Sequence, residues 1–144
     1  MKFVADLLAN KGRDVWSVPP TATVYEALGV MADKNIGALL VLNGDELAGI
    51  ISERDYARRV ALQGRRSRDT PVGDIMTRVV ATVSESHSVQ DCMELMTRER
   101  VRHLPVIQHG RLAGVISIGD VVFSMISEQK DLINQLESYI QGKV

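Results

Sequence analysis

The sequence predicts an α+β fold in which one motif occurs twice, and two observations support this prediction. Residues 47–55 and 112–120 both read Leu-Ala-Gly-apolar-Ile-Ser-x-x-Asp, at an offset of 65 residues from Asp55 to Asp120. Around this segment, each copy combines one helical pattern with two short apolar runs. Because neither copy could bury its apolar strand faces alone, we expect the two copies to pack against each other about a pseudo-two-fold axis.

Each copy is predicted to contain a helix upstream of the repeated segment. Thr23 stands three residues before Glu26, and Ser88 stands three residues before Asp91. A hydroxyl residue followed at this spacing by an acidic residue is typical of a helix start, because each side chain can cap a free backbone N–H group. Apolar residues follow at helical spacing in both copies, so both segments are expected to be amphipathic helices.

The repeated segment is predicted to be the second strand of a hairpin. In copy one, the apolar run 38–42 is followed by Asn43-Gly44, a strong hairpin signal, and then by the strand 47–51. In copy two, 104–107 and 112–116 flank a polar turn. With a short strand in front and a helix behind, each copy becomes a β-α-β-β-α unit.

Alignment of the copies divides the chain into two motifs and an extension. Copy one covers 3–61 and copy two covers 72–126, with a polar and basic linker within 64–71. The opening segments match at an offset of 68 rather than 65, so copy one carries extra residues near 10–15. Residues 127–144 are expected to form a C-terminal helical extension.

An amphipathic helix is expected from about Asp120 to Ile140. Its apolar residues, including Ile126, Ile133 and Leu136, recur at three- and four-residue spacing. Such a stripe is too large to stay exposed to water, and large exposed apolar patches normally mark interfaces. We therefore expect a homodimer to which this helix contributes.

Composition argues against several classes of protein. The 144 residues include 17 basic and 18 acidic side chains, a balance that disfavours nucleic acid as a partner. The chain has no apolar run of membrane-spanning length, so no membrane partner is expected. Its start lacks the apolar stretch of a secretory signal, and one cysteine fits a reducing compartment, so we expect a cytoplasmic protein.

The cysteine and the histidines do not suggest redox or metal chemistry. Cys92 aligns with Ala27 of the first copy, which favours a small core position over a redox role. His87, His103 and His109 stand apart from cysteines and paired carboxylates. No metal is therefore expected to be required.

The chain resembles a pair of CBS motifs, together called a Bateman module. That family's signature is a strand reading Gly-apolar-x-(Ser/Thr)-x-x-Asp at the start of a helix, and residues 49–55 and 114–120 both match it in full. The resemblance covers all but about the last fifteen residues and is particularly close to small bacterial and organellar CBS proteins. It implies clefts between the motifs that bind AMP, ADP, ATP, or sometimes NAD or S-adenosylmethionine. It also implies a sensor that dimerises as a flat disc.

The residues themselves support such a site. A serine at the end of a strand lies beside the free N–H groups of the following helix, where anions bind. Ser117 could therefore hold a phosphate while Asp120 accepts the hydroxyl groups of a ribose, and Ser52 and Asp55 could do the same. The alternative is that both pairs are only helix caps. The identity of the two pairs, each following the same glycine, favours the site.

The two copies are not equivalent, which predicts unequal occupancy. Arg102 aligns with Gly37, and Arg54 aligns with Gly119. Arg102 and His103 precede a strand where the family often places a phosphate-binding arginine, so we expect the cleft with Asp120 to be occupied more reliably. Each arginine could instead be a solvated surface charge. Adenine is expected beside backbone segments 36–38 and 101–103. The full set of candidate ligand residues is Ser52, Arg54, Asp55, Ile36, Gly37, Ala38, Thr82, Val101, Arg102, His103, Ser117 and Asp120.

These observations predict a non-catalytic sensor of adenine nucleotides that acts on an unidentified regulated protein. The alternative is a protein–protein interaction module whose dimer binds a partner without nucleotide. An enzyme is the weaker hypothesis, because the sequence has no Ser/His/Asp order, no P-loop and no metal-ligand set.

Overall fold

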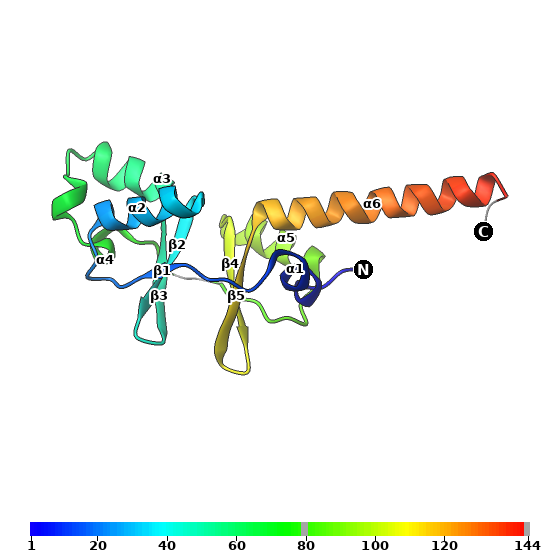
Figure 1. Cartoon of the computed structure of the whole chain (residues 1–144), viewed down its shortest axis with the longest axis horizontal. Coiled ribbons are helices and arrows are strands. Elements are labelled where there is room, and N and C mark those ends of the chain that lie inside the picture. Colours follow the sequence, from blue (N-terminus) through cyan, green and yellow to red (C-terminus); the bar gives the residue numbers. More distant parts are fainter. Residues whose placement is uncertain (79–80, 143–144) are drawn as a thin grey trace. The chain divides into compact units, whose positions relative to one another are not determined.

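The structure is a computed structural model that describes residues 1–78 and 81–142 (Figure 1). The chain divides into two units. Unit 1 combines Met1–Asp14 with the chain from Ala81 onward, and unit 2 is the intervening Val15–Val80. No helix of the described residues is both long and apolar enough to cross a membrane.

Unit 2 contains the hairpin of the first copy. Its three-stranded sheet has the order β1-β2-β3, with β1 parallel to β2 and β2 antiparallel to β3. The described residues of unit 2 also form three α-helices, a π-helical turn and a 3-10 turn. The bounds are β1 Ser17–Val18, α2 Val24–Lys34, β2 Ala38–Asn43, β3 Glu46–Ser52, α3 Glu53–Tyr56, η1 Ala57–Ala61, η2 Ser67–Asp69 and α4 Val72–Ile75.

Unit 1 repeats this plan with a reduced first strand. Its antiparallel hairpin pairs β4 with β5, and an isolated parallel bridge joins Val83 to Val106 where unit 2 has β1. The predicted α+β fold with two repeats and a long C-terminal helix is therefore confirmed. The bounds are α1 Val4–Lys11, α5 Val89–Glu99, β4 His103–Gln108, β5 Arg111–Ser117 and α6 Ile118–Ile140.

The two hairpins are alike in detail. Each contains a register irregularity at the same repeat position, after Val41 in one hairpin and after Val106 in the other. Both turns use residues with positive φ: Gly44 at 64° in the first, His109 at 53° and Gly110 at 73° in the second. Positive φ gives a two-residue turn the twist of its flanking strands. The turn chemistry therefore holds both repeated segments in the same register.

The first helix of each sequence copy, α1 or α4, explains why the repeated segment contains a glycine. In unit 1, α1 packs on β5, and a Cβ atom added at Gly114 would lie 2.8 Å from Leu8 Cδ2. In unit 2, the segment that includes α4 lies against β3, and a Cβ at Gly49 would lie 2.7 Å from the carbonyl oxygen of Thr77. Each glycine is thus required by a close approach of the opening segment of the other sequence copy.

Each unit has its own hydrophobic core, built from the same repeat positions. Leu39, Val41 and Ile51 are buried in unit 2, as are Leu104, Val106 and Ile116 in unit 1. Cys92 is fully buried in the core of unit 1, as predicted from its alignment with Ala27. Burial raises the pKa of its thiol to about 11, which leaves it uncharged at neutral pH.

The C-terminal extension continues a helix that begins inside the second copy. Helix α6, drawn in orange to red in Figure 1, is 23 residues long. Of the expected extension 127–144, the last two residues lie outside the described part of the chain. Helix α6 exposes a row of large apolar side chains: Ile118, Val122, Phe123, Ile126, Leu132, Ile133, Leu136, Tyr139 and Ile140.

Candidate functional site

The two serine–aspartate pairs form nearly the same helix cap. The backbone N–H of Asp120 donates to Ser117 Oγ at 3.2 Å, and the N–H of Ser117 donates to Asp120 Oδ2 at 2.8 Å. The corresponding distances for Asp55 and Ser52 are 3.1 and 3.0 Å. Both pairs therefore serve as capping boxes, whatever else they do.

Helix-cap geometry alone does not mark a ligand site. The start of α5 has the same arrangement, with Asp91 N–H donating to Ser88 Oγ at 3.0 Å and Ser88 N–H donating to Asp91 Oδ2 at 3.1 Å. What distinguishes the other two turns is the set of groups that gathers around them.

In unit 1, the hairpin brings four of the predicted residues together. Cross-strand pairing places His103 opposite Ser117, and Ile118 N–H donates to the carbonyl oxygen of Arg102 at 2.9 Å. The start of α6, with Asp120, therefore lies beside the backbone that precedes β4. Arg102 is exposed and His103 is half-buried.

In unit 2, the same pairing joins the residues of the first copy. Ala38 lies opposite Ser52, and Glu53 N–H donates to the carbonyl oxygen of Gly37 at 3.0 Å. Arg54 is exposed on the first turn of α3. Asp55 is half-buried beside it.

Three of the predicted ligand residues are less directly connected to the two serine–aspartate turns. Ile36 and Val101 are half-buried. Each directly precedes the residue whose carbonyl oxygen accepts a hydrogen bond from the start of α3 or α6. Thr82 is exposed, next to the bridge between Val83 and Val106, and no hydrogen bond joins it to the other candidate residues in the described part of the chain.

Sequence reasoning missed the second partner residue of each aspartate, the one that lies outside the helix cap. In unit 1, Lys11 Nζ donates to Asp120 Oδ2 at 2.6 Å and to the carbonyl oxygen of Val115 at 3.0 Å. In unit 2, the hydroxyl of Thr77 donates to Asp55 Oδ1 at 3.0 Å. The sequence signal nearest to Lys11 is the insertion near 10–15, which corresponds to the eight residues of α1 against the four of α4. That signal marks a difference between the copies but does not identify the contact.

Burial, hydrogen bonds and neighbouring charges together set the protonation of Asp120 and His103 in unit 1. Burial opposes ionisation of Asp120, but hydrogen bonds from Lys11 and Ser117 outweigh it, and the pKa of the carboxyl is lowered. Burial is also the main reason why the pKa of His103 is lowered, assisted by the positive charges of Lys11 and Arg102. At neutral pH the group therefore holds a carboxylate, two cations and an uncharged imidazole.

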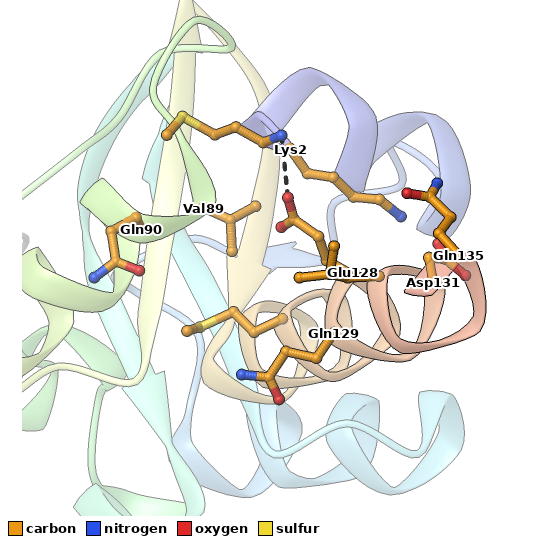
Figure 2. A pocket seen from close by; sticks show the side chains of 10 residues that line it. Lys2, Val89, Gln90, Glu128, Gln129, Asp131 and Gln135 are labelled. Atoms are coloured by element: carbon orange, nitrogen blue, oxygen red, sulfur yellow. Dashed lines mark ion pairs between the residues drawn. The ribbon is translucent and has the colours of Figure 1, made fainter. Parts of the chain in front are cut away.

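A cavity of about 580 Å³ lies elsewhere in unit 1. Figure 2 shows it between the N-terminal residues, the start of α5 and the middle of α6. The amino group of Met1, which also lines the cavity, forms an ion pair with Glu128 Oε1 at 3.0 Å. None of the predicted ligand residues lines this cavity. Within the described residues, no group of three or more histidine, cysteine, aspartate or glutamate side chains could hold a metal ion.

Comparison with known proteins identifies the class. The family model of the CBS domain matches residues 4–62 and 72–127, and the chain belongs to this family. It is a CBS-domain pair, and such pairs are regulatory modules.

Individual relatives agree with this assignment. The mitochondrial CBS domain-containing protein CBSX3 of Arabidopsis thaliana is 42% identical over 96% of this chain and 72% of its own. A CBS-domain protein of Burkholderia ambifaria MC40-6 has a solved structure that is 51% identical, with a TM-score of 0.85 over 89% of this chain and 96% of its own. A CBS domain protein of Pyrobaculum aerophilum, solved in complex with AMP, is 27% identical, with a TM-score of 0.74 over 87% of this chain and 98% of its own.

Proposed function

We propose that this chain is a non-catalytic sensor that binds AMP, or a related adenine nucleotide such as ADP, ATP or NAD, at the turn that carries Ser117 and Asp120. The observation that carries the proposal is the group formed by Lys11, Arg102, His103 and Asp120. A carboxylate suits a ribose, and a cluster of cations beside a helix N-terminus suits a phosphate. The AMP complex of the Pyrobaculum aerophilum relative supports the choice of ligand.

The availability of the aspartate oxygens favours this turn over its counterpart. Asp120 Oδ2 accepts two hydrogen bonds, whereas Oδ1 accepts none from any described residue. Both oxygens of Asp55 are engaged, Oδ2 by Ser52 and Oδ1 by Thr77. A ribose hydroxyl could bind Asp120 without displacing a protein donor, so we propose that this turn fills first.

Calorimetric titration of AMP into Asp120→Ala tests the proposal. We expect binding at this turn to be lost, while the helix cap costs about 0.5–2 kcal/mol of unfolding free energy. Asp91→Ala is the matched control, because it removes the same kind of cap from α5 and should leave AMP affinity unchanged. If Asp120→Ala lowers stability but leaves AMP affinity intact, the pair is only a cap and the proposal fails.

Arg102→Ala tests the phosphate contact separately. We expect AMP to lose more affinity than adenosine, because only AMP offers a phosphate to the guanidinium group and charge-assisted hydrogen bonds are the stronger kind. An equal loss for both compounds would assign Arg102 to the nucleoside or to the fold instead.

We also propose that two copies associate through α6 in the cytoplasm. Val122, Ile126, Ile133, Leu136 and Ile140 follow a heptad seam, the pattern by which one helix packs along another. Leu136 and Ile140 are 54% and 81% exposed, which supports an interface that a second α6 would cover.

Sedimentation of the Leu136→Glu variant tests the association. We expect it to shift the protein from dimer to monomer, because a charge in the seam would lose its hydration without gaining a partner. Ser138→Glu, on the opposite side of the helix, is the control and should remain a dimer. A monomeric parent protein at tens of micromolar, about the range in which a standard-size interface persists, would contradict the proposal.

The alternative function is an interaction module that binds a protein partner without nucleotide. Thermal unfolding separates the two hypotheses, because a ligand at 100 times its Kd adds about 2.7 kcal/mol of stability. No stabilisation by any adenine nucleotide would favour the interaction module.

A further inference from the structure

We propose that Lys11 determines the ligand specificity of the Asp120 turn, selecting adenine compounds that carry a phosphate over uncharged adenosine. The inference rests on the proposed function and assigns a specific role to one member of its group, a residue that lies outside the repeated segments. Lys11 reaches the turn from the last residue of α1, more than 100 positions away in the sequence.

The geometry gives Lys11 two contacts that fix its position. Its Nζ donates to Asp120 Oδ2 at 2.6 Å and to the carbonyl oxygen of Val115 at 3.0 Å. Its side chain is 33% exposed and that of Asp120 is 25% exposed, so the pair is partly withdrawn from water. Charges in such a setting act more strongly on a nearby ligand than fully solvated charges do.

The two turns differ in net charge because of this residue. In unit 1, Lys11 and Arg102 outnumber Asp120, so the group carries an excess positive charge while His103 is neutral. In unit 2, Arg54 and Arg59, which donates to the carbonyl oxygen of Met76, are balanced by Glu53 and Asp55. The donor to Asp55 is the uncharged hydroxyl of Thr77. A phosphate is therefore attracted more strongly to the unit 1 turn than to its counterpart.

Lys11 also neutralises the carboxylate that a phosphate would otherwise face. Without Lys11, Asp120 would keep its negative charge and repel the phosphate of AMP. A ribose hydroxyl would still find its acceptor on that carboxylate. The loss of Lys11 should therefore weaken AMP and leave adenosine nearly unaffected, which distinguishes charge selection from support of the fold.

The experiment measures AMP and adenosine affinities by calorimetry in an Asp55→Ala background, so that only the Asp120 turn is read. We expect Lys11→Met to weaken AMP by about tenfold, the loss of one charge-assisted contact, with little change for adenosine. Lys11→Arg keeps the charge and should restore most of the AMP affinity. Lys2→Met, which removes the same charge ahead of α1, is the control.

Thermal unfolding of each variant confirms that it is folded before titration. An equal loss for AMP and adenosine in Lys11→Met, or no loss for either, would overturn the inference. If Asp120→Ala abolishes AMP binding while Lys11→Met leaves it intact, the proposed function stands and Lys11 has no part in specificity. A parent protein that binds neither compound at this turn would overturn both.

Discussion

The two serine–aspartate turns have the same residues and nearly the same cap, but they differ in the segment that reaches them. Asp120 receives a lysine from α1, and Asp55 receives a hydroxyl from Thr77, just after α4. One turn is consequently ion-paired and cationic, whereas the aspartate of the other is held by neutral donors. Duplication of a motif therefore does not duplicate its chemistry, because the neighbouring segment decides the charge.

The largest difference in stability should come from the glycines beneath the turns. Gly49→Ala would press a Cβ atom against the backbone oxygen of Thr77, which cannot move without shifting the chain. Gly114→Ala would meet a methyl group of Leu8, which can turn aside. We expect Gly49→Ala to cost about 1–3 kcal/mol of unfolding free energy, and Gly114→Ala less than about 1 kcal/mol.

Urea denaturation of both variants measures these costs. Equal costs would mean that Leu8 is held as rigidly as the backbone at Thr77, and that the two opening segments constrain their strands alike.

The second-largest difference should lie in how salt changes the stability of the two aspartate variants. Asp120→Ala and Asp55→Ala each lose a cap, worth about 1 kcal/mol. Asp120→Ala also loses its ion pair with Lys11, a contribution below about 1 kcal/mol at this exposure. Salt screens that attraction, so the unfolding free energy lost in Asp120→Ala should decrease as the salt concentration rises from about 0.05 to 0.5 M. The unfolding free energy lost in Asp55→Ala should stay constant over the same range.

Denaturation at the two salt concentrations gives both costs directly. A cost of Asp120→Ala that does not change with salt would show that the ion pair adds nothing to stability.

The smallest effect should come from His103, whose counterpart is Ala38. Its folded-state pKa lies below the unfolded value, mainly because of burial, with Lys11 and Arg102 opposing its charge and Asp120 favouring it. Below about pH 6.5 the unfolded chain therefore binds a proton that the folded chain does not, and stability falls as the pH drops towards the folded pKa. His103→Ala should remove this loss.

Denaturation at about pH 7.5 and pH 5.5 brackets that window. The lowered pKa of Asp120 affects stability in a different pH window. The stability that the ionised Asp120 contributes is lost only below the ordinary carboxyl pKa of 3.8. If the stability of His103→Ala depends on pH as that of the parent protein does, another titrating group causes the loss of stability.

Local signals predicted the repeated elements well. The capping residues Thr23 and Ser88 begin their helices, and the hairpins form with the expected strands. These features depend on neighbours in the sequence, so a repeat and its spacing reveal them. The ligand role of the candidate residues stays a prediction, because the cap and the site use the same serine and aspartate.

Long-range contacts were not predictable in this way. The packing of Leu8 on Gly114 and the ion pair of Lys11 with Asp120 join residues separated by more than 100 positions. No local sequence pattern predicts whether the first helix of a copy packs on the hairpin of its own copy or of the other copy. The insertion near 10–15 marked where the copies differ but could not indicate that the longer helix would place a charge on the other copy's turn.

The placement of α1 in unit 1 has a consequence for synthesis of the chain. Helix α1 leaves the ribosome before β5, on which its Leu8 packs, because β5 is made about 100 residues later, on the order of ten seconds at ordinary translation rates. Unit 2 is complete before then. The apolar face of α1, with Val4, Leu7 and Leu8, therefore lacks its native partners until the rest of unit 1 emerges, and during that interval it is available to a chaperone.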